Sequence, residues 1–123
     1  MNQALIVFGH GSRDPLWAGT LMALCERLRG ALPHIEVELA YIEFLKPTLA
    51  ECVELLWRRG YRDIAVLPAF IAAGTHLQKE LPELVEQAHS GREGLSIRLF
   101  PALGDLPEVQ QGVVRFVADQ FVR

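Results

Sequence analysis

Residues 4–15 read ALIVFGHGSRDP, an unbroken apolar run from Ala4 to Phe8 followed by a glycine-rich turn that contains His10. An apolar run without alternation is typical of a parallel strand that is covered on both faces. Asp14 and Pro15 are residue types that often begin helices. The stretch therefore predicts a buried strand, a tight turn and then a helix.

The same order recurs along the chain and predicts a βαβαβαβα domain of the α/β class. A second unbroken apolar run covers residues 64–70, whereas residues 35–39 and 95–99 alternate apolar with polar side chains, as edge strands do. Right-handed crossovers then give a small, doubly wound, parallel four-stranded sheet with strand order 2-1-3-4. Pro68 indicates that the third strand ends or bulges there, because proline donates no ladder hydrogen bond.

Capping residues predict where the four helices begin and end. Pro82 predicts a short helical turn, a kink and then the third helix proper, because proline removes a backbone donor. The expected boundaries are Asp14-Pro15 for the first helix, Pro47 and Gly60 for the second, a Thr75–Gln78 capping box for the third, and an Asp105–Glu108 capping box for the fourth.

Composition narrows the class of protein. The chain has 123 residues, a net charge of −3 and two cysteines, so we expect one domain over residues 1–123 that needs no disulfide. The mild acidity argues against a nucleic-acid partner. Cys25 and Cys52 lack a CxxC spacing, which predicts core thiols and a reduced, cytoplasmic setting. The N-terminus shows no export signal and no apolar run is long enough to span a bilayer, so we expect neither secretion nor a membrane.

Three chemically capable side chains follow predicted strands. His10 follows the first strand, Glu43 the second, and His76 the third after a glycine-containing loop. Because ligands of open α/β sheets bind at the carboxyl ends of the strands, we expect these residues at one edge. Two imidazoles and a carboxylate suit an open site for a divalent transition metal and also suit proton transfer. The alternative interpretation makes His10 a turn residue and Glu43 a cap or ion-pair partner.

The remaining histidines and polar residues divide between the two edges of the sheet. His34 and His89 are expected at the opposite edge, in structural or solvated roles. The polar groups expected beside His10 and His76 suit an anionic ligand with carboxylates. They are Ser12, Arg13, Lys46, Gln78 and Lys79.

Three motifs carry a resemblance to a known family. They are GHGSRDP at residues 9–15, EFLKP at 43–47, and PAFIAAGTH at 68–76 followed by ELP at 80–82. Together they resemble the short CbiX form of the class II tetrapyrrole chelatases, the sirohydrochlorin cobaltochelatases. The resemblance covers essentially the whole chain and implies a chelatase-like, flavodoxin-like single lobe. Glu80 and Thr75 depart from the Asp and Val that are common in the family.

The resemblance also implies a function. Family members insert a divalent metal into sirohydrochlorin without ATP, in cobalamin or related tetrapyrrole biosynthesis; the metal is typically Co²⁺, with Ni²⁺ or Fe²⁺ in relatives, and no organic cofactor is implied. By resemblance His10 and His76 take the metal-binding and proton-abstracting positions, and Glu43 takes the acidic position. Short forms are similar to one half of their longer relatives, which implies a homodimer. Trp17, Phe44 and Phe70 are the expected interface residues.

The chemistry of metal insertion assigns the remaining polar residues. Arg13, Lys46 and Lys79 are expected to bind the acetate and propionate groups of the substrate, together with Ser12. Two alternatives are a non-catalytic metal or tetrapyrrole binder and a histidine phosphatase. The phosphatase requires an Arg before the histidine, where this chain has Gly9.

Overall fold

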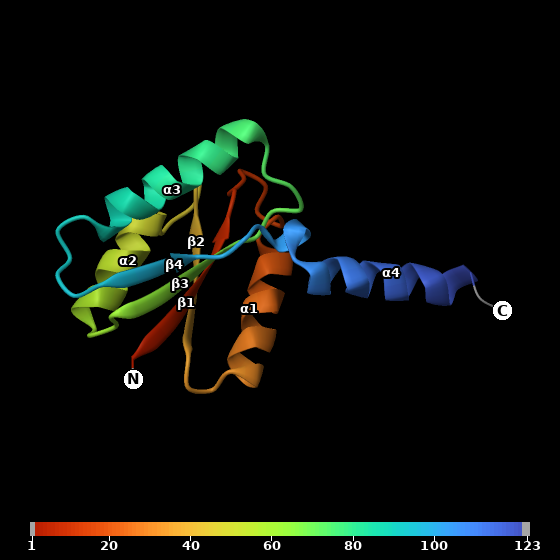
Figure 1. Cartoon of the computed structure of the whole chain (residues 1–123), viewed down its shortest axis with the longest axis horizontal. Coiled ribbons are helices and arrows are strands. Elements are labelled where there is room, and N and C mark those ends of the chain that lie inside the picture. The colour runs from red at the N-terminus through yellow and green to blue at the C-terminus, as the bar shows by residue number, and fades with distance from the viewer. Residues whose placement is uncertain (1, 122–123) are drawn as a thin grey trace.

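The computed structural model describes residues 2–121. Figure 1 shows a sheet with helices on both sides and one helix that leaves the body. The elements are β1 (Gln3–Gly9), α1 (Gly19–Ala31), β2 (Glu36–Tyr41), α2 (Leu49–Arg58), β3 (Asp63–Pro68), α3 (Thr75–His89), β4 (Ser96–Leu99), the 3-10 turn η1 (Leu103–Asp105) and α4 (Pro107–Phe121).

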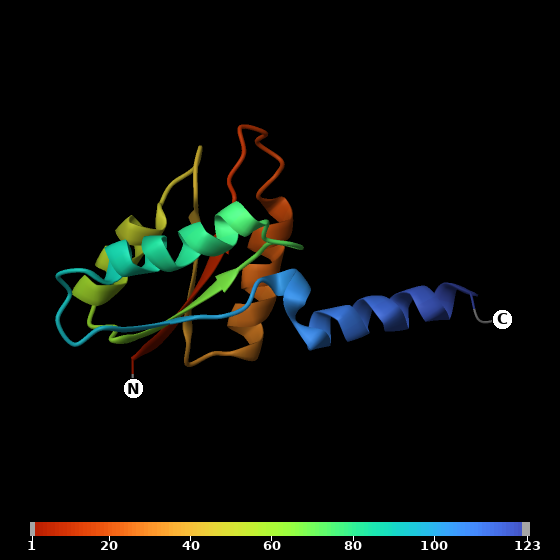
Figure 2. The same cartoon turned by 45° about the horizontal axis from the view of Figure 1, so that its top comes forward.

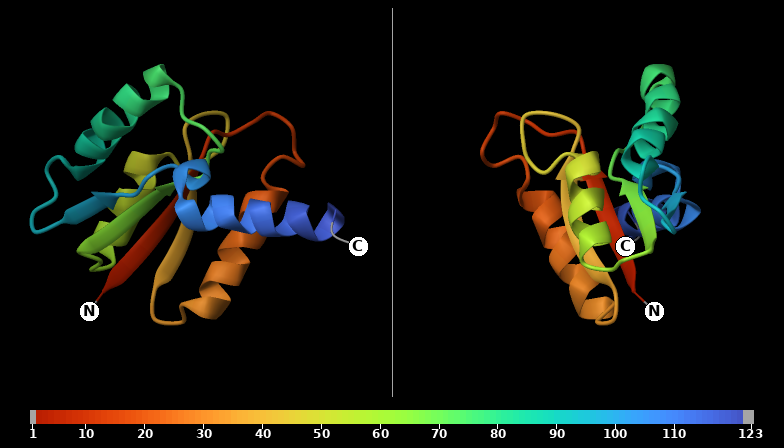
Figure 3. Two further views of the ribbon diagram at one scale, coloured as in Figure 1. Left: turned by 45° about the vertical axis from the view of Figure 1, so that its right-hand side comes forward. Right: turned by 90° about the vertical axis from the view of Figure 1, so that its left-hand side faces the viewer.

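The sheet has the predicted topology. All strand pairs are parallel and the order is β2-β1-β3-β4, which Figure 3 shows from a second side. At the carboxyl end Phe8 lies opposite Ala40 on one side and Pro68 on the other. The third strand ends at Pro68, as predicted, although the Ala69 N–H after it still donates to the Phe8 carbonyl at 2.8 Å.

Two apolar layers hold the helices on the sheet. On one face α2 and α3 pack over side chains of the central strands that include Ile6 and Phe8, and on the other face α1 packs over Leu5 and Val7. Cys25 and Cys52 are buried core residues, as predicted. Burial raises the pKa of the Cys52 thiol to about 12, so this sulfur is a protonated packing group rather than a metal ligand.

The first two helix starts differ from the predicted ones. Asp14 accepts a hydrogen bond from the Leu16 N–H at 2.9 Å and therefore stabilises a turn, while α1 begins at Gly19. The cap of α2 is Thr48, which forms a reciprocal capping box with Glu51. The second helix ends before Gly60, as predicted, where a φ of 98° suits glycine.

The capping predictions for the last two helices are wrong. Gly74 is the cap of α3 and makes no side-chain hydrogen bond, so Thr75 is the first helical residue. Asp105 belongs to η1, and α4 begins at Pro107. Proline suits the first position of a helix, because a backbone N–H there would have no partner within the helix.

The predicted interruption at Pro82 is also wrong, since α3 is one helix from Thr75 to His89. The missing N–H removes a single hydrogen bond from the ladder. Leu81 and Ala88 are buried in the layer between α3 and the sheet, and this packing holds the helix together across the proline.

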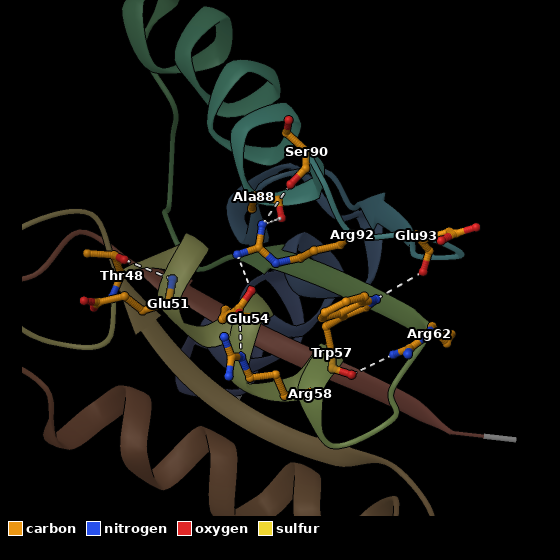
Figure 4. A network of polar contacts seen from close by, with 10 residues as sticks. All are labelled: Thr48, Glu51, Glu54, Trp57, Arg58, Arg62, Ala88, Ser90, Arg92 and Glu93. Atoms are coloured by element: carbon orange, nitrogen blue, oxygen red, sulfur yellow. Dashed lines mark hydrogen bonds and ion pairs between the residues drawn. The ribbon is translucent and has the colours of Figure 1, made fainter.

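A polar network ties the end of α3 and the loop after it to α2 (Figure 4). The Arg92 guanidinium lies 2.6 Å from the Glu54 carboxylate and donates to the Ala88 carbonyl at 2.8 Å. The Trp57 indole N–H donates to the Glu93 carbonyl at 3.1 Å. These contacts therefore hold the loop that leads into β4 against both α2 and the end of α3.

Two glutamates share one side of the edge strand β2. Hydrogen bonding to Glu36 and partial burial raise the pKa of the Glu38 carboxyl to about 7, while the same bond lowers the pKa of Glu36. A protonated Glu38 thus donates to an ionised Glu36, whose oxygen also lies 3.6 Å from the Arg59 guanidinium.

Within residues 2–121 no helix combines the length and the apolar character needed to cross a membrane.

Replacing Arg92 by Met should destabilise the fold, because it removes an ion pair and the donors to two backbone carbonyls from a site where the side chain is only 17% exposed. We expect a loss of about 2 kcal/mol, measured by thermal unfolding monitored by circular dichroism. The matched control is Arg58→Met, which removes a 71% exposed partner of the same Glu54 and should change stability little. Equal losses in the two variants would contradict the structural role of Arg92.

Glu38→Gln should stabilise the protein at alkaline pH. The folded chain keeps the Glu38 proton up to about pH 7, whereas the unfolded chain releases it near the ordinary value of 4.5, so stability falls as pH rises through this window. Gln imitates the protonated form, and the unfolding temperature at pH 8 should rise by about 3 °C. The gain should vanish at pH 4. The matched control is Glu83→Gln, at an exposed position of α3, which should not change the unfolding temperature in this way.

Candidate functional site

The loops after β1 and β2 remain paired beyond the ends of the strands. The Ile42 N–H donates to the Gly9 carbonyl at 3.0 Å, and the Glu43 N–H donates to the His10 carbonyl at 3.0 Å. His10 and Glu43 are therefore neighbours through their backbones at the carboxyl edge of the sheet. Both residues are exposed.

Gly11 allows these two loops to touch. Its φ is 93°, a left-handed conformation, and a Cβ atom at this position would overlap the Glu43 carbonyl oxygen. No side chain larger than hydrogen fits without moving the Glu43 loop. The glycine after His10 thus has a steric role in holding Glu43 beside the histidine.

The His10 ring packs against Phe70. Their ring centres are 4.8 Å apart and the rings are inclined by 56°. Phe70 comes from the loop after β3 and is 5% exposed, so it is a rigid support for an exposed imidazole. The expectation that Phe70 contributes to a dimer interface is wrong, because its side chain is already covered by its own chain.

His76 lies on the first turn of α3. Its side chain is 94% exposed, and Nε2 lies 3.1 Å from the Glu80 carboxylate one turn later. Glu80 is a partner that the sequence analysis did not assign, although the spacing of four residues on a predicted helix would have indicated it. The Glu80 carboxylate is therefore placed to orient the His76 ring.

The three expected metal-site residues are on loops or helix starts that follow neighbouring strands, but they form no compact ligand cluster. In the part of the chain from residue 2 to residue 121, no three His, Cys, Asp or Glu side chains are grouped so that they could hold a metal ion. The structure instead shows His10 beside the Glu43 backbone and His76 bonded to Glu80.

The expected substrate-binding residues have local partners. The Ser12 hydroxyl accepts the Asp14 N–H at 3.0 Å, and the Arg13 guanidinium lies 4.5 Å from the ring centre of Phe44. Phe44 itself has a φ of 68°, which is uncommon for a residue other than glycine. This contact holds Arg13 over the loop that follows Glu43.

The two expected lysines extend into solvent. Lys46 lies 3.3 Å from the Glu51 carboxylate and its side chain is 82% exposed. Lys79 is exposed on α3, as is Gln78. These cationic ends stand near the loops after β2 and β3, where they can reach an anionic ligand.

The other two histidines lie at the amino edge of the sheet, as expected. His34 is exposed in the loop before β2. His89 ends α3, and its Nε2 lies 2.7 Å from the Leu95 carbonyl, a structural contact with the loop before β4.

A small hollow lies beside the carboxyl edge, between the loop after β2 and the helices α2 and α3. Its volume is about 210 Å³, and its lining includes Phe8, Ile42, Leu49 and Leu84. Pockets that bury most of a drug-sized ligand measure roughly 300–1,000 Å³. This hollow is therefore too small to bury a large planar ligand.

The parallel four-stranded lobe, with histidines after its first and third strands, has the α/β fold of a solved CbiX protein. The CbiX family model matches residues 4–120, and the chain belongs to the CbiX family. The fold and the resemblance read from the motifs are thereby confirmed.

Solved structures support the fold. A putative cobalamin biosynthesis CbiX protein from Marinobacter aquaeolei is 29% identical, with a TM-score of 0.83 and 96% of each chain covered. The sirohydrochlorin chelatase SirB from Bacillus subtilis, solved in complex with cobalt, is 26% identical with a TM-score of 0.79. That match covers 97% of this chain and 51% of SirB.

Curated relatives include a sirohydrochlorin cobaltochelatase of Methanocaldococcus jannaschii, 34% identical over 83 residues, and one of Methanococcus maripaludis, 28% identical over 92 residues. The matches cover 68% and 75% of this chain and 58% and 64% of those relatives, respectively. The chain thus spans less than two thirds of the length of either relative.

Gly11→Ala should disturb the edge of the sheet that carries His10 and Glu43. The new methyl group overlaps the Glu43 carbonyl and strains a left-handed backbone, so we expect a loss of about 1–3 kcal/mol in the free energy of unfolding, measured by urea titration. Gly19→Ala is the matched control, because a Cβ there meets no atom within 4 Å. An unchanged stability of Gly11→Ala would show that the two loops are not in contact.

Proposed function

We propose that this chain inserts a divalent metal ion into sirohydrochlorin without ATP, with Co²⁺ as the favoured metal and Ni²⁺ or Fe²⁺ as alternatives. The observation that carries the proposal is the pair of exposed imidazoles, His10 on Phe70 and His76 on Glu80, on a CbiX-family lobe. Bacillus subtilis SirB, which has the same fold, has been solved with cobalt and with Fe³⁺.

Metal insertion requires the protein to assist two steps. The metal must lose water, and the macrocycle must lose two pyrrole N–H protons as the metal enters, so that one M²⁺ replaces two H⁺. The His10 imidazole, which is exposed and packs against Phe70, is assigned the presentation of the metal. His76 is assigned the acceptance of a proton, and the Glu80 carboxylate, 3.1 Å from Nε2, is assigned the orientation of the ring.

The remaining assignments concern the substrate. Glu43 is the acidic group beside His10 and is assigned the second proton. Ser12, Arg13, Lys46 and Lys79 are assigned the carboxylates of the tetrapyrrole, which match their charge and hydrogen-bonding capacity. The reaction as proposed uses no organic cofactor.

The proposed setting and assembly follow from the same properties. We assign the activity to the cytoplasm, in the biosynthesis of cobalamin or a related tetrapyrrole. A homodimer supplies a second wall over His10 and His76, which are both exposed in a single lobe, and a planar ligand needs such a wall to be buried.

A non-catalytic metal or tetrapyrrole binder is the second candidate. The observation that favours it is that Arg13, Lys46 and Lys79 are all exposed, so they can hold an anionic ligand without any chemical step. A phosphatase of the histidine type is disfavoured because that chemistry needs an arginine before the histidine, where this chain has Gly9.

The proposal is tested by following the visible spectrum of sirohydrochlorin with purified protein and each of Co²⁺, Ni²⁺ and Fe²⁺. His10→Ala and His76→Ala should each lower the rate above the uncatalysed background by about 100-fold or more, because each removes a ligand or a base. The matched control, His34→Ala, changes an exposed histidine at the opposite edge and should leave the rate unchanged. Tight binding of metal or macrocycle without turnover would favour the binder, and equal losses in all three variants would refute the assigned roles.

A further inference from the structure

The contact between Arg13 and Phe44 joins the two loops that carry His10 and Glu43. Figure 2 shows the loop after β1 and the loop after β2 projecting beyond the same end of the sheet, and Figure 3 shows the same loops from two further directions. The Arg13 guanidinium carbon lies 4.5 Å from the ring centre of Phe44. Arg13 follows His10 in one loop and Phe44 directly follows Glu43 in the other, so the contact adjoins the candidate site.

The backbone of Phe44 is in a conformation that phenylalanine rarely adopts. Its φ of 68° lies in the left-handed region that favours glycine, and the residue is 54% exposed. The hydrogen bond from the Glu43 N–H to the His10 carbonyl and the close approach of Gly11 hold the loop in this shape. Because the ring is only partly buried, packing compensates for little of the backbone strain. The position of the ring therefore indicates a role at the surface and not in the core.

Arg13 differs from the other arginines that lie over aromatic rings. Each of those has a second partner within the chain, since Arg59 and Arg98 each lie 3.6 Å from a carboxylate and Arg62 donates to two main-chain carbonyls. Within residues 2–121, the Arg13 side chain forms no ion pair and donates no hydrogen bond. Its N–H groups are therefore available to a ligand.

An arginine that is held in this way suits a carboxylate. The N–H donors of a guanidinium lie in one plane and can give two parallel hydrogen bonds to a carboxylate. An aromatic ring restrains the guanidinium without using these donors, because the attraction acts between the positive charge and the face of the ring. Lys46, by contrast, already lies 3.3 Å from the Glu51 carboxylate. Arg13 is thus a restrained cation whose hydrogen-bonding capacity is unused within the described part of the chain.

We infer that Phe44 is a positioning residue, which holds the Arg13 guanidinium where it binds one peripheral carboxylate of a tetrapyrrole. We call this pair of residues the Arg13–Phe44 clamp. The inference rests on the proposed function and deepens it, because it names the residue that prepares Arg13 and the substrate feature that Arg13 selects. A carboxylate bound at the clamp locates the macrocycle beside His10, since Arg13 and His10 belong to the same loop.

The clamp should act on substrate binding and not on the chemical step. A peripheral carboxylate keeps its charge while the pyrrole nitrogens exchange two protons for the metal, so its contact with Arg13 is equally strong before and during insertion. A contact of this kind lowers KM and leaves kcat unchanged. This behaviour separates Phe44 from His10 and His76, whose removal should lower the rate itself.

The first test is a titration of the full-length protein with metal-free sirohydrochlorin, followed by the visible spectrum of the tetrapyrrole. Arg13→Lys keeps the charge but loses the planar set of donors, and should raise Kd about tenfold. Phe44→Leu keeps an apolar side chain but loses the aromatic face, and should raise Kd about threefold. Phe44→Tyr keeps the aromatic face and should bind as the wild type does. Circular dichroism checks that each variant is folded.

The matched control is Arg59→Lys, which makes the same substitution in an arginine that lies over the Tyr61 ring at the opposite edge of the sheet. Its Kd for sirohydrochlorin should equal that of the wild type.

A double-mutant cycle tests whether the Phe44 ring acts through Arg13. In the Arg13→Ala background, Phe44→Leu should cause no further loss of affinity, because the group that the ring positions is already absent. In the insertion assay, Phe44→Leu alone should raise KM about threefold and leave kcat unchanged.

Unchanged Kd values in both Arg13→Lys and Phe44→Leu would overturn the clamp while the proposed function stands. Losses of affinity that add in the double variant would show that the ring contacts the substrate itself, and would overturn its positioning role. A fall in kcat without a change in KM would overturn that role as well. A wild type that binds sirohydrochlorin but inserts no metal would refute the proposed enzyme, and the same titrations would then still decide the clamp. A wild type that binds no sirohydrochlorin would overturn both.

Discussion

The central position of β1 is the constraint on which the rest of the structure depends. This strand pairs in parallel with β2 on one side and β3 on the other, and Ile6 and Val7 at its middle are fully buried on opposite faces. A strand buried on both faces must continue its hydrogen bonding to its end, because no water is available to replace a missing partner. The pairing therefore runs on into the loops, from Gly9 to Ile42 and from Phe8 to Ala69.

This continuation brings chemically capable residues together without any direct bond between their side chains. Glu43 is placed by a backbone bond to His10, and His10 is placed by the ring of Phe70. Two glycines make the close approaches possible, Gly11 against the Glu43 loop and Gly104 against Ile71. The loops at this edge are thus held by main-chain contacts, which leave the imidazoles exposed and free to meet a metal or a substrate.

The candidate site is exposed on the surface of a small lobe and is not enclosed in a pocket. The His76 ring is almost entirely in solvent and interacts with a carboxylate of its own helix. Solvent weakens electrostatic effects at such a position. A second copy that covers this edge, as in the proposed homodimer, would lower the local polarity and strengthen the same contacts.

The sequence by itself determined the sheet, because the unbroken apolar runs at residues 4–8 and 64–70 and the alternating runs at 35–39 and 95–99 record how many faces of each strand are covered. It also determined which end of each strand carries His10, Glu43 and His76, since chain order alone sets this in a parallel sheet. The helix starts were predicted less well. Asp14 and Asp105 have side chains that often cap helices, but each lies in a local turn before the helix instead. The packing of the buried side of α3 outweighs the effect of Pro82. Only the tertiary structure decided that Phe70 supports His10, that no three ligands are grouped among residues 2–121, and that α4 leaves the body. Each of these depends on contacts between loops distant in sequence, and the same local pattern is compatible with several such arrangements.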